Sequence, residues 1–130
     1  MSNSNYIELK DLEVYQLARE LSTVAWAIYE PMDINTKKTM GDQFLKAMDS
    51  IGANIVEGYG RYHYLDKIKF YYNSRASLFE ACEHWADLIK ERNMMSQEQF
   101  DQIQVQKDRL RVKLNNFIST TYKTYKENKK

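Results

Sequence analysis

Apolar residues recur every three or four positions along most of this chain, in four segments separated by short polar connections. Positions with this spacing share one face of a helix, so each segment predicts an amphipathic helix. The first helix covers residues 11–30, between Asp11 as N-cap and Pro31. The second covers residues 36–58 and stops in Gly58-Tyr59-Gly60, because glycine past the last turn is a common C-terminal cap. The predicted buried faces are Val14, Ala18, Leu21, Ala25 and Ile28 in the first helix, and Met40, Phe44, Ala47, Ile51 and Ile55 in the second.

The third and fourth helices are predicted over residues 64–92 and 96–125. Ser96 and Gln99 have the spacing of a capping box, which marks the start of the fourth helix. The inner face of the third helix is predicted to hold Leu65, Ile68, Tyr72, Phe79, Cys82, Ala86 and Ile89, widened by Leu78 and Trp85, and that of the fourth Phe100, Ile103, Leu110, Leu114, Phe117 and Thr121.

Three short connections between four long helices favour neighbours that run up and down in turn. No segment alternates with a period of two, so we expect no sheet. The chain of 130 residues is long enough for one domain and too short for two independent cores. The sequence therefore predicts an all-α protein, an antiparallel up-down-up-down four-helix bundle over residues 1–130, with a short flexible N-terminus and a lysine-rich C-terminal tail.

Composition adds a location and a charge asymmetry to this picture. No stretch is apolar enough for a membrane span, the first residues lack a secretory signal, and Cys82 is the single cysteine, which together favour a cytoplasmic protein. Residues 1–104 hold 11 basic and 16 acidic residues, whereas residues 105–130 hold 8 basic and 2 acidic ones. The C-terminal excess is either a surface for phosphate or an acidic partner, or a solvated helix face with a frayed tail. Its basic residues are Lys107, Arg109, Arg111, Lys113, Lys123, Lys126, Lys129 and Lys130.

Several apolar residues fall outside the predicted core faces. On the first helix they are Leu12, Tyr15 and Trp26, and on the fourth they are Val105 and Val112, one heptad apart. A monomeric bundle needs one apolar face per helix, so second faces predict contacts with other subunits. The alternative is scattered surface apolar residues, which are normal when they occur singly.

The residues able to carry chemistry are few and isolated. His63 and His84 belong to no metal-binding motif, and Glu80 with His84 forms one loose pair where a bundle di-metal site needs two Glu-x-x-His motifs. Cys82 lies on the predicted inner face and is interpreted as a small buried hydrophobe. The chain contains no nucleophile elbow, phosphate-binding loop or dinucleotide fingerprint. We therefore predict no enzyme, no metal site and no cofactor.

A set of polar residues lies close to the predicted core. Polar groups in such positions must be hydrogen-bonded, since an unpaired one costs about 1–3 kcal/mol. Two interpretations remain open: an interhelical polar layer that fixes the register of the bundle, or a recognition site at the corner between the second and third helices, where Arg61 offers a guanidinium to phosphate or carboxylate. The set consists of Gln43, Ser50, Asn54 and Glu57 on the second helix, and of Ser77 and Glu80 on the third.

Taken together, these motifs resemble the four-helix bundle family of proteins encoded in intervening sequences of 23S rRNA genes, which includes the accessory variability proteins of diversity-generating retroelements. The resemblance spans roughly residues 8–120, and one departure from it is Ala76, where the family often has glycine. The motifs that carry it are Asp11-Leu12-Glu13-Val14-Tyr15-Gln16, Gln43 with Lys46-Ala47, Ser50-Ile51-x-Ala53-Asn54-Ile55-x-Glu57-Gly58-x-Gly60-Arg61, and Ser77-Leu78-x-Glu80.

The resemblance implies a four-helix bundle without enzymatic activity, and homopentameric barrels are known among relatives. For the retroelement branch it implies binding of nucleic acid and of a reverse transcriptase. Those accessory proteins are markedly basic, whereas this chain has a net charge of +1.

Two functions follow from the sequence as competing hypotheses. The first is an oligomeric protein, pentameric by resemblance, that binds RNA or DNA through Lys107, Arg109, Arg111, Lys113 and Arg61, helped by Tyr122 and Tyr125 among the tail lysines. The second is a protein-interaction or scaffold protein, such as a reverse-transcriptase accessory factor, with no direct nucleic-acid role. A small-molecule or metal-binding bundle lacks the convergent polar residues that it would need.

Overall fold

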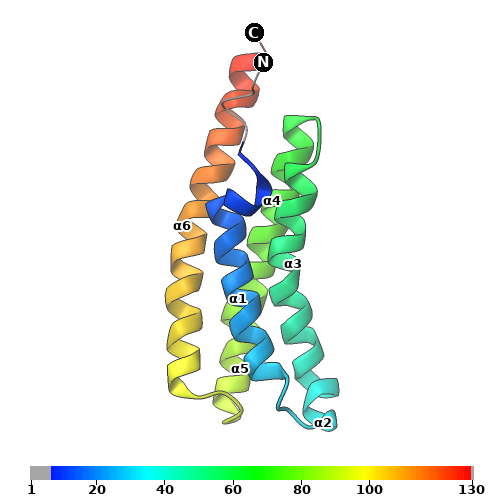
Figure 1. Cartoon of the computed structure of the whole chain (residues 1–130), viewed down its shortest axis with the longest axis vertical. Coiled ribbons are helices and arrows are strands. Elements are labelled where there is room, and N and C mark those ends of the chain that lie inside the picture. The colour runs from blue at the N-terminus through cyan, green and yellow to red at the C-terminus, as the bar shows by residue number, and fades with distance from the viewer. Residues whose placement is uncertain (1–6, 130) are drawn as a thin grey trace.

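Four long helical rods lie side by side in the computed structural model, which describes residues 7–129 (Figure 1). The first rod contacts the second and fourth, and the third rod contacts the same two, so the rods pack as an up-down bundle. The predicted all-α four-helix bundle is therefore confirmed. The rods are, in order, α1 (Glu13–Tyr29) after a short 3-10 turn (Leu9–Asp11); α2 (Ile34–Thr36), the π-helical turn η2 (Lys37–Gly41) and α3 (Asp42–Tyr59); α4 (Tyr64–Phe79), the π-helical turn η3 (Glu80–Trp85) and α5 (Ala86–Glu91); and α6 (Gln97–Asn128).

The first residues of the rods show which of the predicted N-caps are formed. Ser96 caps α6 in a full capping box, in which its hydroxyl accepts from the Gln99 amide at 3.0 Å and the Gln99 side chain accepts from the Ser96 amide at 3.1 Å. Asp33 accepts from the Thr36 amide at 2.8 Å, so the second rod begins earlier than predicted. Asp11 is not the N-cap of α1: it ends the 3-10 turn, and Leu12 occupies the cap position without a side-chain bond.

The predicted buried faces of the first two rods are buried in the structure. On the fourth rod Ile103, Leu110 and Leu114 are buried, and the other three predicted residues are half-buried. The third rod differs, because Leu65, Tyr72 and Phe79 are 49%, 45% and 68% exposed. Each π-helical turn holds more residues than the 3.6 of an α turn, so side chains before and after η3 are out of phase. A single heptad register therefore cannot describe the whole rod. The residues that fill the core ahead of and within η3 are Ile68, Tyr71, Ser74, Leu78, Ala81 and Cys82.

The closest approach of α3 to α4 occurs near the corner that joins them. A Cβ atom added at Gly58 would lie 2.6 Å from Tyr71 Cε1 and 2.9 Å from the Lys67 carbonyl oxygen. Gly58 thus lies inside α3 as a packing residue, while the helix ends at Tyr59 with Gly60, the second glycine of the predicted stop, as its C-cap. The buried hydroxyl of Ser74 donates to the Ile51 carbonyl at 2.8 Å, which links the same two helices by a side-chain hydrogen bond.

Within the described part of the chain, no helix combines the length and the apolar character needed to cross a membrane.

Replacing Gly58 with alanine should lower the free energy of unfolding by about 1–3 kcal/mol, because the new methyl group overpacks against the buried Tyr71 and a backbone carbonyl. Gly52→Ala is the matched control: it is also inside α3, but its added Cβ would meet Tyr15 and Ala18 at ordinary distances of 3.6 and 3.7 Å. That variant should be neutral or stabilised through helix propensity. Urea denaturation of both variants checks this, and equal midpoints would contradict the packing role of Gly58.

Candidate functional site

A groove extends along the contact between α4 and α6, and we refer to it as the α4–α6 groove. It consists of three hollows of about 570, 420 and 530 Å³, and Tyr72 lines both the first and the second. The third hollow lies where the start of α4 meets the end of α6, and there the Asn128 amide donates to the Tyr64 hydroxyl at 3.2 Å. The charged and aromatic residues lining the groove are Tyr72, Arg75, Phe79, Glu83, Lys107 and Arg111 in the first hollow, Tyr72, Tyr122, Lys123 and Lys126 in the second, and Tyr62, His63, Tyr64, Tyr125 and Lys129 in the third.

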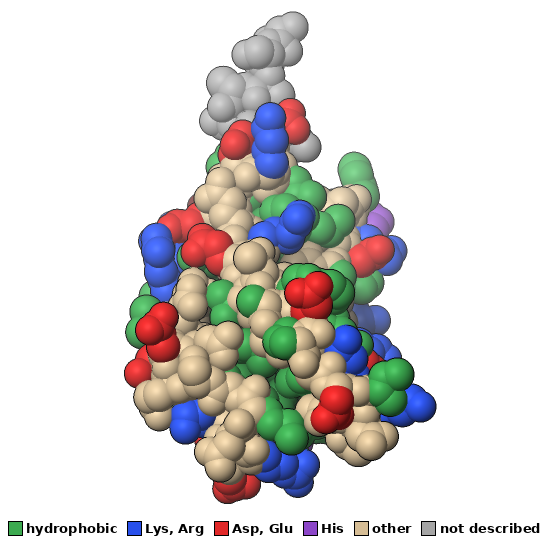
Figure 2. Space-filling view, turned by 60° about the horizontal axis from the view of Figure 1, so that its bottom comes forward, with side chains coloured by type: hydrophobic (Ala, Val, Ile, Leu, Met, Phe, Trp, Pro, Cys, Tyr) green, Lys and Arg blue, Asp and Glu red, His purple; other side chains and the backbone are tan. Residues whose placement is uncertain are grey.

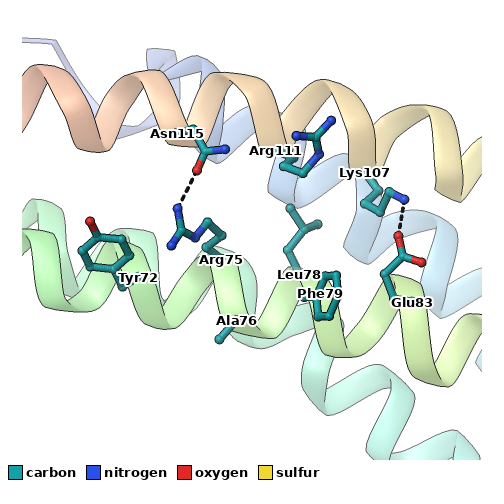
Figure 3. A pocket seen from close by; sticks show the side chains of 9 residues that line it. All are labelled: Tyr72, Arg75, Ala76, Leu78, Phe79, Glu83, Lys107, Arg111 and Asn115. Carbon is teal, nitrogen blue, oxygen red and sulfur yellow. Dashed lines mark hydrogen bonds and ion pairs between the residues drawn. The ribbon is translucent and has the colours of Figure 1, made fainter.

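The first hollow combines an apolar side chain with positioned guanidinium groups (Figure 3). Leu78, which is 2% exposed, points between the two helices. Arg75 reaches across to α6, where its Nη1 atom donates to Asn115 Oδ1 at 2.8 Å. The Arg75 guanidinium also lies 4.7 Å from the centre of the Tyr72 ring. Arg75 is therefore held by both helices.

The two other cations of this hollow have different environments. Lys107 forms ion pairs with Glu83 and, at 3.4 Å, with Asp108. Burial lowers the pKa of Lys107, but the hydrogen bonds and negative charges of these two carboxylates outweigh it and raise the pKa above the usual value. Arg111 makes no ion pair with any residue that the structure describes. Of the three cations in the first hollow, Arg111 is thus the one without a polar side-chain partner among the described residues.

Charge in the α4–α6 groove is one-sided although the chain is nearly neutral. Six basic side chains line its three hollows against the single carboxylate of Glu83. The hollow between α1 and α3 is lined by one basic and one acidic residue, Arg19 and Asp49. Acidic and basic side chains are interspersed over the face seen in Figure 2. The positive excess is therefore a local property of this groove.

The five basic residues predicted to bind nucleic acid lie in three different places. Lys107 and Arg111 line the groove. Arg109 and Lys113 face α1 instead, where both approach Glu13 at 3.7 and 3.4 Å. The reason is helix geometry, since positions two residues apart point in very different directions. They therefore do not form one surface with the groove, and Lys130 lies outside the described residues.

Arg61 does not line the groove either; it lies at the corner after α3, one residue before Tyr62 of the third hollow. It pairs with Glu57 at 3.0 Å, and its guanidinium lies 4.6 Å from the centre of the Phe70 ring. Arg75 is the groove cation that the sequence did not single out. Its position three residues after Tyr72 is a signal for a cation–aromatic pair on a helix surface, but the helical pattern assigns Tyr72 to the core, whereas this side chain is 45% exposed.

For six polar residues near the core, the sequence leaves open an interhelical polar layer or a recognition site. Among described residues, none of Gln43, Ser50, Asn54, Glu57, Ser77 and Glu80 makes a side-chain hydrogen bond to another rod. Asn54 Nδ2 donates to the Ser50 carbonyl of its own helix at 2.9 Å, and Glu80 accepts from the Trp85 indole at 2.9 Å. Asn54 can do this because its partner lies four residues earlier, one helical turn away. The buried interhelical bond comes from Ser74 instead.

The residues predicted to contact other subunits lie in three different places. Leu12 is 6% exposed and packs in the core of its own chain, because the chain before α1 folds over the bundle, so it is not available to another subunit. Trp26 is 52% exposed and, with the partly buried Tyr15, lines a hollow of about 490 Å³ between α1 and α3. Val105 and Val112 are 68% and 48% exposed on α6.

The remaining reactive residues are placed as follows. His84 packs against Trp85 with ring centres 4.7 Å apart, and His63 packs against Tyr62 at 5.0 Å. Within residues 7–129, no cluster of three or more His, Cys, Asp and Glu side chains has an arrangement able to hold a metal ion. Cys82 is fully buried, and this burial raises the pKa of its thiol to about 12. Cys82 is therefore a small core residue with a protonated thiol.

This architecture defines the class of protein: a small helical bundle with a basic and aromatic groove between two of its rods. The chain belongs to the 23S rRNA-intervening sequence protein family, whose profile matches residues 10–116. It is similar in fold to the crystal structure of a protein of unknown function from the S23 ribosomal protein family of Bacteroides thetaiotaomicron, with a TM-score of 0.72 and 23% identity over 81% of this chain and 97% of that one. Comparison with curated proteins found no match.

Cys82 should react with iodoacetamide at least about 100-fold more slowly in the native protein than in guanidinium, because the thiolate is the reactive form and burial suppresses both ionisation and access. Mass spectrometry of samples quenched over time at pH 8 measures both rates. Comparable rates in the two states would show that Cys82 is accessible and that this part of the core opens readily.

Proposed function

We propose that this protein is a non-enzymatic nucleic-acid-binding protein, and that the α4–α6 groove is the surface that binds the phosphate backbone. The observation that carries the proposal is the local excess of six basic side chains over one carboxylate along the groove. Phosphate neutralisation supplies most of the affinity of sequence-independent binding, so a local field of this kind is sufficient. Net charge of the chain is less relevant, because screening limits each charge to about 10 Å.

The arrangement of the cations supports binding along the whole groove. Arg111 is unpaired among described residues and Arg75 is already oriented by Asn115, so neither must be reorganised before it contacts an anion. Near the end of α6, Lys126 and Lys129 lie over the rings of Tyr122 and Tyr125. A backbone that follows the groove would thus meet a cation in each hollow.

The more specific relationship, to accessory variability proteins of diversity-generating retroelements, belongs to this proposal. The motifs between Ser50 and Arg61 support it, and it adds a reverse transcriptase as a protein partner. The same motifs also fit the wider 23S rRNA-intervening sequence family. The proposal that this chain binds nucleic acid is the same for either relationship.

Arg111→Glu and Lys126→Glu, singly and together, should weaken binding of labelled RNA and DNA to all sequences alike, because phosphate contacts position a ligand without reading it. Fluorescence anisotropy at 50 and 200 mM salt measures this. The logarithm of the binding constant should fall with the logarithm of salt by about 0.7 per single-strand phosphate neutralised.

Arg109→Glu is the matched control, since it makes the same charge change on the same helix but on the side facing Glu13. It should have a much smaller effect than Arg111→Glu. Absence of binding by the unmodified protein at 50 mM salt would refute the proposed function, and equal losses in the two variants would refute its assignment to the groove.

A second proposal concerns assembly. We infer that copies of the chain associate through the hollow between α1 and α3, whose rim exposes 52% of Trp26 and 41% of Val56, and through the valine pair on α6. These surfaces are on different sides of the bundle and differ in composition. Contacts between two different surfaces are heterologous and close into a ring when the rotation permits, which agrees with the pentamer implied by resemblance.

Light scattering at micromolar concentration should therefore give a mass several times 15.5 kDa. Trp26→Asp and Val105→Asp, each on a different surface, should both reduce that mass, because each side of a heterologous contact is needed. Lys38→Asp, an exposed position outside both surfaces, is the control. A monomer mass for the unmodified protein would overturn the assembly proposal and leave the groove proposal intact.

A further inference from the structure

The α4–α6 groove carries a row of exposed aromatic side chains that phosphate binding does not use. Phe79 is 68%, Tyr72 45% and Tyr122 41% exposed, and all three line the groove. Single exposed apolar residues are normal on a protein surface, but here three rings alternate with cations along one line. This combination is the one that proteins use to hold unpaired bases.

The three rings differ in whether a cation already lies over them. Phe79 has no ring or cation partner among described residues, so its faces are open. Tyr72 already carries the Arg75 guanidinium at 4.7 Å, and the Tyr122 ring lies 4.8 Å from Lys126 Nζ. A guanidinium plane is itself a surface on which bases stack. The groove therefore offers one bare ring and one ring–guanidinium stack, both on α4.

The position of Phe79 follows from the fold. It is the last residue of α4 before the π-helical turn η3, and the change of phase at this turn leaves Phe79 exposed while Ala86, seven residues later, is fully buried. In an uninterrupted α-helix, two residues seven apart would lie on nearly the same face. An exposed phenyl ring beside Arg111 and Lys107 is thus a product of this turn.

We propose that the groove is selective for single-stranded nucleic acid, with bases stacked on Phe79 and on the Tyr72–Arg75 pair while Arg111 and the lysines of α6 hold the phosphates. This proposal rests on the proposed function and narrows its ligand. In a duplex, the base faces are covered by neighbouring base pairs, so the aromatic row contributes only when the bases are unpaired. Stacking uses the faces of the bases and not the 2′-hydroxyl group of the sugar. RNA and DNA strands should therefore bind with similar affinity.

The dimensions of the groove give the expected length of the ligand. Tyr72 and Phe79 are separated by seven residues of helix, or about 10 Å. At about 3.4 Å per nucleotide this distance corresponds to about three stacked nucleotides. From Leu65 in α4 to Glu83 in η3 the groove follows the third rod for about 27 Å, which corresponds to about eight nucleotides. Affinity per site should therefore level off near this length.

The experiment is an anisotropy titration of the full chain with single-stranded DNA and RNA of 4, 8 and 16 nucleotides and with a 16-base-pair duplex. Single strands of eight or more nucleotides should bind more tightly than the duplex at equal salt. Phe79→Ala should weaken single-strand binding by about 5- to 150-fold, equivalent to about 1–3 kcal/mol, and leave duplex binding unchanged. Phe79→Leu, which keeps an apolar side chain without a ring, should show most of the same loss, and Phe79→Trp should retain binding.

The control is Ile34→Ala, which removes an apolar side chain of similar exposure, 69%, from a position outside the groove and outside both proposed assembly surfaces, and should leave the ratio of single-strand to duplex affinity unchanged. Because Phe79 is exposed, its variants should keep the denaturation midpoint of the unmodified protein, which verifies folding. Equal affinity for single strand and duplex, or equal losses for both in Phe79→Ala, would overturn the stacking proposal while the phosphate-binding function stands. Failure to bind any nucleic acid would overturn both.

Discussion

The π-helical turn η3 changes which side chains of the third rod face the core. This change also decides which side chains of that rod line the α4–α6 groove. Ahead of the turn, Tyr71, Ser74 and Leu78 face the core; beyond it, Ala86 and Ile89 do so. A straight α-helix of this length would drift relative to its neighbours, and the turn restores contact. In exchange, Phe79 is exposed beside the cations of α6.

The opposite side of α4 is fixed by its close packing against α3. Gly58 allows the helices to approach until only a hydrogen atom fits beside Tyr71, and the Ser74 hydroxyl bonds to the Ile51 carbonyl within this contact. Lys67 Nζ donates to the Tyr59 carbonyl at 2.9 Å and so satisfies a carbonyl near the end of α3. With α4 held on this side, its contact with α6 and the width of the groove are determined by side chains such as Arg75 and Asn115.

Three basic residues outside the groove have acidic partners among the described residues. Arg109 and Lys113 approach Glu13, and Arg61 approaches Glu57. Exposed pairs of this kind contribute little to stability, but they reduce the field that each cation projects. Within the groove only Glu83 opposes the cations, and it is engaged by Lys107. A nearly neutral chain can in this way present a strongly basic surface on one side, which is the basis of the binding proposed here.

Sequence alone determined the number of helices, the capping box at Ser96 and the buried faces of the first two rods, because the period of an α-helix and its caps are local properties. It also carried the motifs of the family to which the chain belongs. Tertiary structure alone decided that Leu12 is buried, that Asn54 bonds within its own helix, and that Arg111 and Arg109 belong to different surfaces. Helical periodicity states which residues share a face but not which neighbour that face meets. A pattern with a single period cannot represent the phase change at η3, and this change brings Tyr72 and Phe79 from the expected core into the groove, beside Arg75.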